Sequence, residues 1–184
     1  MLTVKERGQF VATLRYVHVA LMETLAAWVP TTPEMEVKLL LGEHIWDAAQ
    51  HADSLGKRTF ELRMPLQKSI PAAAEYLDFL ATVRAIEPTP QRLAAMYDVL
   101  LPALVERQRR YLERTDKLVD APTVRILERF FADATRMIDG AQVLRHDLPA
   151  LQLADRQWVS NLKAREAALE LVATAPAESV AVGA

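Results

Sequence analysis

The sequence predicts an all-α protein, and three observations lead to this prediction. Only five of the 184 residues are glycine, and the helix-favouring residues Ala, Leu, Arg and Glu dominate the composition. Prolines mark breaks between long stretches, as in Val29-Pro30-Thr31-Thr32-Pro33 and Glu87-Pro88-Thr89-Pro90. Within those stretches apolar residues recur every three or four positions, which is the spacing of one helix face.

Composition limits the classes of function. The apolar fraction of 51% and the charged fraction of 25% are ordinary for a globular protein, and the length suits one domain. We expect a single helical domain over residues 1–173 and a disordered tail over residues 174–184. A net charge of -2 gives no basic footprint for nucleic acid, and the absence of cysteine excludes disulfides and thiolate chemistry. With no convincing signal peptide or membrane span, we expect a cytoplasmic protein without a membrane partner.

The first predicted helix covers residues 4–28. A second helix is predicted to begin after Thr32, as the N-cap, with Pro33 at the first helical position, and to continue to about residue 63. The apolar periodicity of the first helix runs through Leu14, Val17, Leu21 and Leu25.

Four more helices are predicted after the second one. Pro102 lies inside one of them and predicts a kink, because proline lacks the backbone N–H that a helix interior needs. The predicted helices cover residues 72–84, 91–114, 120 or 121 to 145, and 154–172.

The connections predict how the long helices are arranged. Short links make the first and second long helices antiparallel neighbours, and likewise the third and fourth. About 25 residues separate the second long helix from the third, enough to run the length of a helix. We therefore expect a four-helix bundle of two antiparallel pairs joined by one long crossover, with an extra C-terminal helix.

A polar stripe on the second helix is the best candidate site. Glu43, Asp47, Gln50 and His51 have the spacing i, i+4, i+7 and i+8, which places them within roughly 100° of one helix face. Two carboxylates and an imidazole on one stripe can bind a metal or move protons. The alternative is a solvated i,i+4 surface pair, but the neighbouring alanines favour a crowded interior.

Two segments resemble a known family. Residues 43–53 and residues 115–127 resemble the ferritin-like superfamily, the relatives of the diiron-carboxylate four-helix bundles, with the resemblance extending over residues 4–144. It implies a ferritin-like bundle, oxidative chemistry on an organic substrate, and iron or manganese held by inward Glu residues and Glu-x-x-His pairs.

The ligand set expected from this resemblance is incomplete. The fourth long helix should supply a Glu-x-x-His pair, but Ala134 and Met137 stand where the pair would lie. A complete diiron site is therefore not expected, and either one iron or manganese ion or no metal remains open. The candidate metal ligands are Glu23, Glu43, Asp47, His51 and Glu106.

Two functions remain open from the sequence. The first is a small-molecule enzyme with a pocket inside the bundle, using a reduced metal site or an Asp47–His51 acid–base pair. The second is a non-catalytic accessory protein that has lost its diiron site. The enzyme would use Asp47, His51 and Tyr16 as catalytic residues and Gln50, Tyr97 and Gln108 as substrate-binding residues.

Other polar residues are expected to be structural. His18 and His44 point away from the polar stripe and are predicted to be structural or exposed. Arg107-Gln108-Arg109-Arg110 is predicted to be a solvated charge run, apart from an inward Gln108. The C-terminal helix, through Trp158, is the predicted contact of a homodimer.

Overall fold

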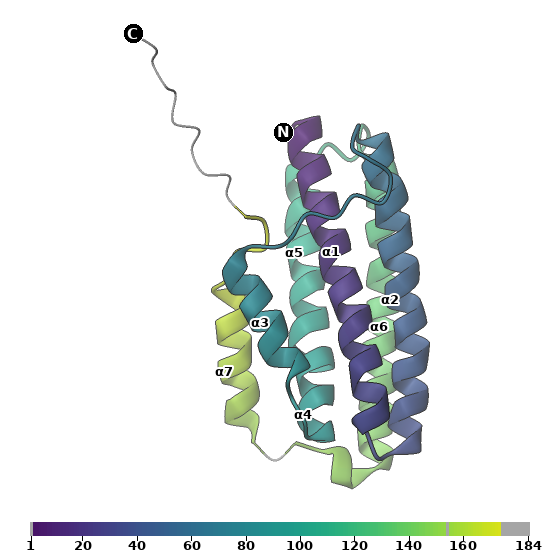
Figure 1. The fold of residues 1–184 in the computed structure, drawn as a ribbon, viewed down its shortest axis with the longest axis vertical. Helices are drawn as coiled ribbons and strands as arrows, with labels where there is room; N and C mark the ends of the chain where they lie inside the picture. Colours follow the sequence, from purple (N-terminus) through teal and green to yellow (C-terminus); the bar gives the residue numbers. More distant parts are fainter. Residues whose placement is uncertain (1, 154, 174–184) are drawn as a thin grey trace.

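The computed structural model describes residues 2–153 and 155–173, and within these residues the chain is helical without strands. Figure 1 shows four long helices side by side, α1, α2, α5 and α6, with α3 and α7 beside α5. Short 3₁₀ turns, Val29–Thr31 and Pro149–Leu151, follow α1 and α6. The helices are α1 (Val4–Trp28), α2 (Met35–Glu61), α3 (Ala74–Arg84), α4 (Thr89–Leu93), α5 (Leu101–Arg114), α6 (Ala121–Asp147) and α7 (Arg156–Ala167).

Helix α1 has the predicted bounds. Thr3 and Glu6 form a capping box at its start, in which each side chain accepts a hydrogen bond from the other residue's backbone N–H. By length and composition alone, the segment Val4–Thr31 could also cross a membrane, whereas no membrane span was predicted from the sequence. Half of its most apolar stretch is buried in the bundle, where Val11, Leu14, Val17 and Leu21 belong to the core.

The predicted cap of α2 is wrong. Thr32 donates its hydroxyl to the carbonyl of Trp28 at 2.8 Å, so it closes the end of α1 and does not cap the next helix. Helix α2 begins at Met35 with Glu34 at the N-cap position. The short link still makes α1 and α2 antiparallel neighbours, as predicted.

The predicted long crossover joins α2 to the second pair of helices. After Glu61 the chain crosses α1, where Ile70 N–H donates to Ala12 O, and then descends as α3. Helix α5 consequently runs in the same direction as α2, and α6 returns antiparallel to it (Figure 1). The contacting pairs α1–α2, α2–α6 and α5–α6 are all antiparallel, whereas α2 and α5, which follow one another along the chain, run in the same direction. This connectivity differs from that of an up-down-up-down bundle.

A π-helical stretch interrupts the third long helix. It covers Ala94–Leu100, between α4 and α5, so that helical structure is continuous from Thr89 to Arg114. The stretch ends just before Pro102, which cannot donate a backbone hydrogen bond. The kink predicted at Pro102 therefore takes the form of a wider, π-helical turn on the N-terminal side of this proline.

Arg107 fastens α7 to the bundle, so the predicted solvated charge run is wrong at this residue. Its guanidinium donates to Glu166 Oε1 at 2.8 Å, to Glu166 O at 2.8 Å and to Leu169 O at 2.9 Å. It therefore ties the last turn of α7 and the residues just after it to α5. The same guanidinium lies over the Tyr76 ring of α3, at 5.2 Å from the ring centroid.

Buried Asp120 joins three long helices at the turn between α5 and α6. Its Oδ1 accepts from Arg58 of α2 at 2.9 Å and from Thr123 of α6 at 2.6 Å. Its Oδ2 accepts from Tyr111 of α5 at 2.6 Å and from Thr115 at 3.0 Å. Burial would raise the pKa of Asp120, but these hydrogen bonds outweigh it and hold the pKa below its usual value.

We predict that Asp120→Ala lowers the free energy of unfolding by about 3–5 kcal/mol, because it leaves the buried Arg58 guanidinium without its main counter-charge. Urea denaturation followed by circular dichroism measures the change. Asp139→Ala removes an exposed carboxylate of α6 and is the control, with an expected change within about 0.5 kcal/mol. Equal effects of the two substitutions would show that the network contributes no net stability.

Candidate functional site

The polar stripe of α2 lies at the edge of the inward face, not at its centre. His51 is buried, Asp47 and Gln50 are half-buried, and Glu43 is exposed. The centre of the inward face instead carries His44, which is 1% exposed, in line with Val37, Leu41 and Ala48. Of the two alternatives predicted for His44, structural or exposed, its burial excludes the exposed one.

Arg136 of α6 occupies the space between the two α2 carboxylates. Its guanidinium donates to Asp47 Oδ2 at 2.8 Å and to Glu43 Oε1, and it lies 3.5 Å from Asp133 Oδ1. Hydrogen bonding with Asp47 raises the pKa of Arg136. The predicted Asp47–His51 acid–base pair is not formed, because Asp47 is directed to Arg136.

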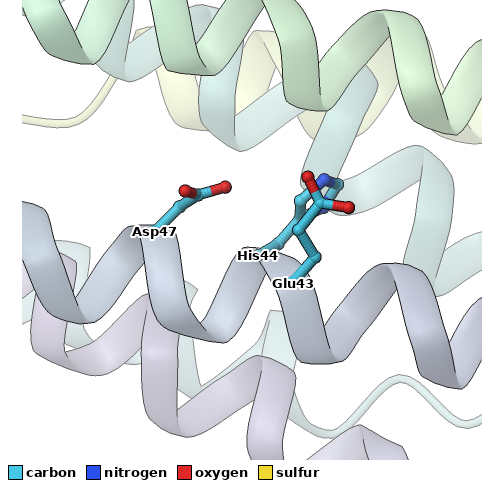
Figure 2. Close-up of side chains that lie close together, drawn as sticks. All are labelled: Glu43, His44 and Asp47. Carbon is cyan, nitrogen blue, oxygen red and sulfur yellow. The ribbon is translucent and has the colours of Figure 1, made fainter.

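Glu43, His44 and Asp47 are the one group in the described part of the chain with three potential metal ligands close together. Their ligand atoms lie within 4.8 Å of one another, and Figure 2 shows the three side chains extending from α2 toward α6. A cation here would have to displace the Arg136 guanidinium from both carboxylates. The group therefore fits an ion pair with arginine better than a resident metal ion.

His44 is joined to the π-helical stretch. Its Nδ1 lies 2.7 Å from the hydroxyl of Tyr97, which is fully buried. Burial lowers the pKa of His44 to about 4, outweighing the nearby Asp47 carboxylate, and burial raises the pKa of Tyr97. Both groups are therefore neutral at pH 7, and the imidazole tautomer decides which of the two donates the hydrogen bond.

His51 meets two aromatic neighbours at the centre of the bundle. Its ring centroid lies 5.5 Å from that of His18 of α1 and 5.2 Å from that of Phe130 of α6. Nε2 of His51 lies 3.2 Å from Asp133 Oδ2, but the contact lacks hydrogen-bond alignment. Burial lowers the pKa of His51 and lowers that of His18 to about 3, so neither ring is charged at pH 7.

The space inside the bundle is small. The central cavity has a volume of about 10 Å³, close to what a single water molecule needs, so the expected substrate pocket inside the bundle has no room for an organic molecule. Its wall is apolar apart from the two imidazoles. The lining residues are His18, Leu21, Leu25, Ala48, His51, Met96, Leu101, Phe130 and Met137.

Two inward i,i+3 pairs flank this cavity, one on α2 and one on α6. The α2 pair is Ala48 and His51, and the α6 pair is Ala134 and Met137, all of them buried. These are the positions where a Glu-x-x-His pair would present both side chains to a bundle centre. The residues present offer one imidazole and no carboxylate, so they do not fit a diiron-carboxylate centre.

The remaining candidate residues are not among those that line the central cavity. Glu23 is exposed and lies 3.7 Å from Arg84 of α3, while Glu106 is exposed and accepts from Arg110 at 2.9 Å. Tyr16 is half-buried. Gln108 is fully buried as predicted, but its amide nitrogen and oxygen lack hydrogen-bond partners.

Comparison with known proteins identifies no relative of this chain. No protein-family model matches it, and neither the curated proteins nor the solved structures contain a significant match.

We predict that stability falls as the pH is lowered from 7.5 to 5. The buried histidines have pKa values below the usual 6.5, so between pH 6.5 and 4 the unfolded chain binds more protons than the folded chain. The loss should be about 2 kcal/mol per fully buried histidine between pH 6.5 and 5. Urea denaturation at several pH values measures it.

His18→Leu should flatten this pH dependence, since it removes one of the buried imidazoles. His146→Gln is the matched control, because His146 is 88% exposed and should leave the pH profile unchanged. A profile that is identical in wild type and His18→Leu would contradict the assignment of the effect to buried histidine.

Proposed function

We propose that this protein is a ferritin-like bundle that has lost its metal centre and acts as a non-catalytic accessory protein. The helix directions and the long crossover support the ferritin-like assignment. The loss of the metal centre is inferred from the side chains at the bundle centre. Ala48, Ala134 and Met137 are buried there, at inward positions suited to metal ligands. A centre without carboxylates lacks the oxygen ligands that iron and manganese prefer.

The outer face of α2 supports a role in association. Met35, Leu39 and Trp46 are 62%, 70% and 67% exposed, which is unusual for large apolar side chains grouped on one helix face. Together with Gly42 and Ala49 they form a seam of five residues. Their spacing alternates between four and three residues, as in helices that pack along one face. A Cβ added at Gly42 would meet nothing within 4 Å, so the seam is open to a partner.

The proposed partner is a second copy of the chain, packed through this α2 face about a twofold axis. None of the five seam residues is charged, so two copies can meet along the seam itself without burying like charges, with Glu36 and Glu43 at its margin. Trp158, the expected dimer contact, is half-buried and packs against the core of its own chain. We therefore place the proposed interface on α2 and not on α7.

The enzyme remains the weaker proposal. Its expected acid–base pair requires Asp47 and His51 to face one another, whereas Asp47 pairs with Arg136 and His51 lies beside Asp133. A reduced site with one iron or manganese ion would have to use Glu43, His44 and Asp47 after Arg136 had moved. The accessory role needs neither rearrangement.

We predict that the wild-type protein is a dimer in sedimentation experiments and that Leu39→Ser/Trp46→Ser is a monomer. Polar side chains at these two positions would remove most of the apolar surface that a partner helix buries. Leu118→Ser is the control, since Leu118 is 86% exposed on the α5–α6 turn, away from α2. A monomeric wild type, or a double variant that stays dimeric, would contradict self-association through α2.

A further inference from the structure

A groove lies between the bundle and α7. Its volume is about 1070 Å³, the size of small-molecule sites in proteins and far above the 10 Å³ of the bundle centre. One wall is the π-helical stretch and the start of α5, and the other is α7. The end of α6 and the segment before α7 complete it.

The groove has an excess of positive charge that originates from α7. Five of its lining residues are Arg or Lys, and three are Asp or Glu. Each carboxylate is already paired with an arginine of the wall: Asp98 with Arg145 at 2.6 and 2.9 Å, Glu106 with Arg110 at 2.9 Å, and Glu166 with Arg107 at 2.8 Å.

Arg156 and Lys163 are the two remaining basic residues of the groove lining. Neither has a carboxylate within ion-pair distance in residues 2–153 and 155–173, and both are exposed on α7 at the groove. They are seven residues apart, so they lie on the same face of α7, two turns from one another. A ligand in the groove therefore meets two positive charges that no carboxylate of the described residues neutralises.

The rest of the lining is suited to an apolar body. Val99, Pro102 and Ala103 come from the π-helical stretch and α5, and Ile138 and Val159 come from α6 and α7. Neutral amides and a hydroxyl lie among them. The π-helical stretch places Tyr97, Asp98 and Val99 along this wall, and such stretches are frequent at functional sites.

We propose that this groove binds a free small molecule that has an anionic head and an apolar body. The head, a carboxylate, sulfonate or phosphate, is held by Arg156 and Lys163 on α7. The body lies against Val99, Pro102 and Ala103 on the wall of the bundle. The site is separate from the α2 face, so ligand binding and self-association can be tested independently.

A fluorescence titration with 1-anilinonaphthalene-8-sulfonate tests this site, because the probe combines an aromatic body with a sulfonate. The wild type is expected to bind it saturably. Arg156→Gln/Lys163→Gln should weaken binding at least tenfold. Lys117→Gln/Arg125→Gln removes the same charge from exposed residues outside the groove and should leave binding unchanged.

Substitutions that fill the groove test where the probe binds, whereas the charge-removing variants test which charges it recognises. Ala103→Trp and Ser160→Trp each place a large ring on the lining, from opposite walls, and either variant that keeps the wild-type circular dichroism spectrum should lose binding. Leu39→Ser/Trp46→Ser should retain binding, which excludes the apolar α2 face as the probe's location.

Three outcomes would overturn the proposal. Wild-type binding in both folded tryptophan variants would show that the probe is not in the groove. Equal effects of the two charge-removing variants would show that Arg156 and Lys163 do not recognise the anion. Sedimentation of the protein with phosphatidylglycerol vesicles, lost in Arg156→Gln/Lys163→Gln, would identify a lipid surface as the ligand in place of a free molecule.

Discussion

The hydrogen-bond network of buried Asp120 sets the relative positions of the long helices. Arg58 of α2, Tyr111 of α5 and Thr123 of α6 all donate to this one carboxylate. Phe10 of α1 stacks on Tyr111 with ring centroids 4.2 Å apart, which brings the fourth helix to the same place. A buried carboxylate is tolerable only with several donors, so the four helices have little freedom to slide past one another.

This arrangement separates three regions with different chemistry. The bundle centre is apolar, with neutral His18 and His51 and almost no free volume. The outer face of α2 presents apolar side chains to solvent, whereas the groove beside α7 presents two basic residues without a carboxylate partner among the described residues. Both proposed binding surfaces lie outside the bundle, and the interior, which holds the metal in a diiron bundle, is filled here by packed side chains.

Local sequence patterns were sufficient for the helices but not for the site. The bounds of α1 matched because capping and apolar spacing are encoded within the segment. On α2 the polar spacing of Glu43, Asp47 and His51 suggested an inward stripe, but the apolar spacing through Leu41, His44 and Ala48 identifies the buried face. Arg136 could not be paired with Glu43 from the sequence, because 93 residues separate them and only the packing of α6 on α2 brings them together.

The residues at the bundle centre offer imidazole but no carboxylate, so they do not fit the metal ions of a diiron protein. The most direct test is the iron and manganese content of protein purified without chelators from cells supplied with both metals, measured by mass spectrometry. The structure predicts far less than one metal ion per chain. One or two ions per chain that remain bound through gel filtration, and are lost in His51→Ala, would contradict it.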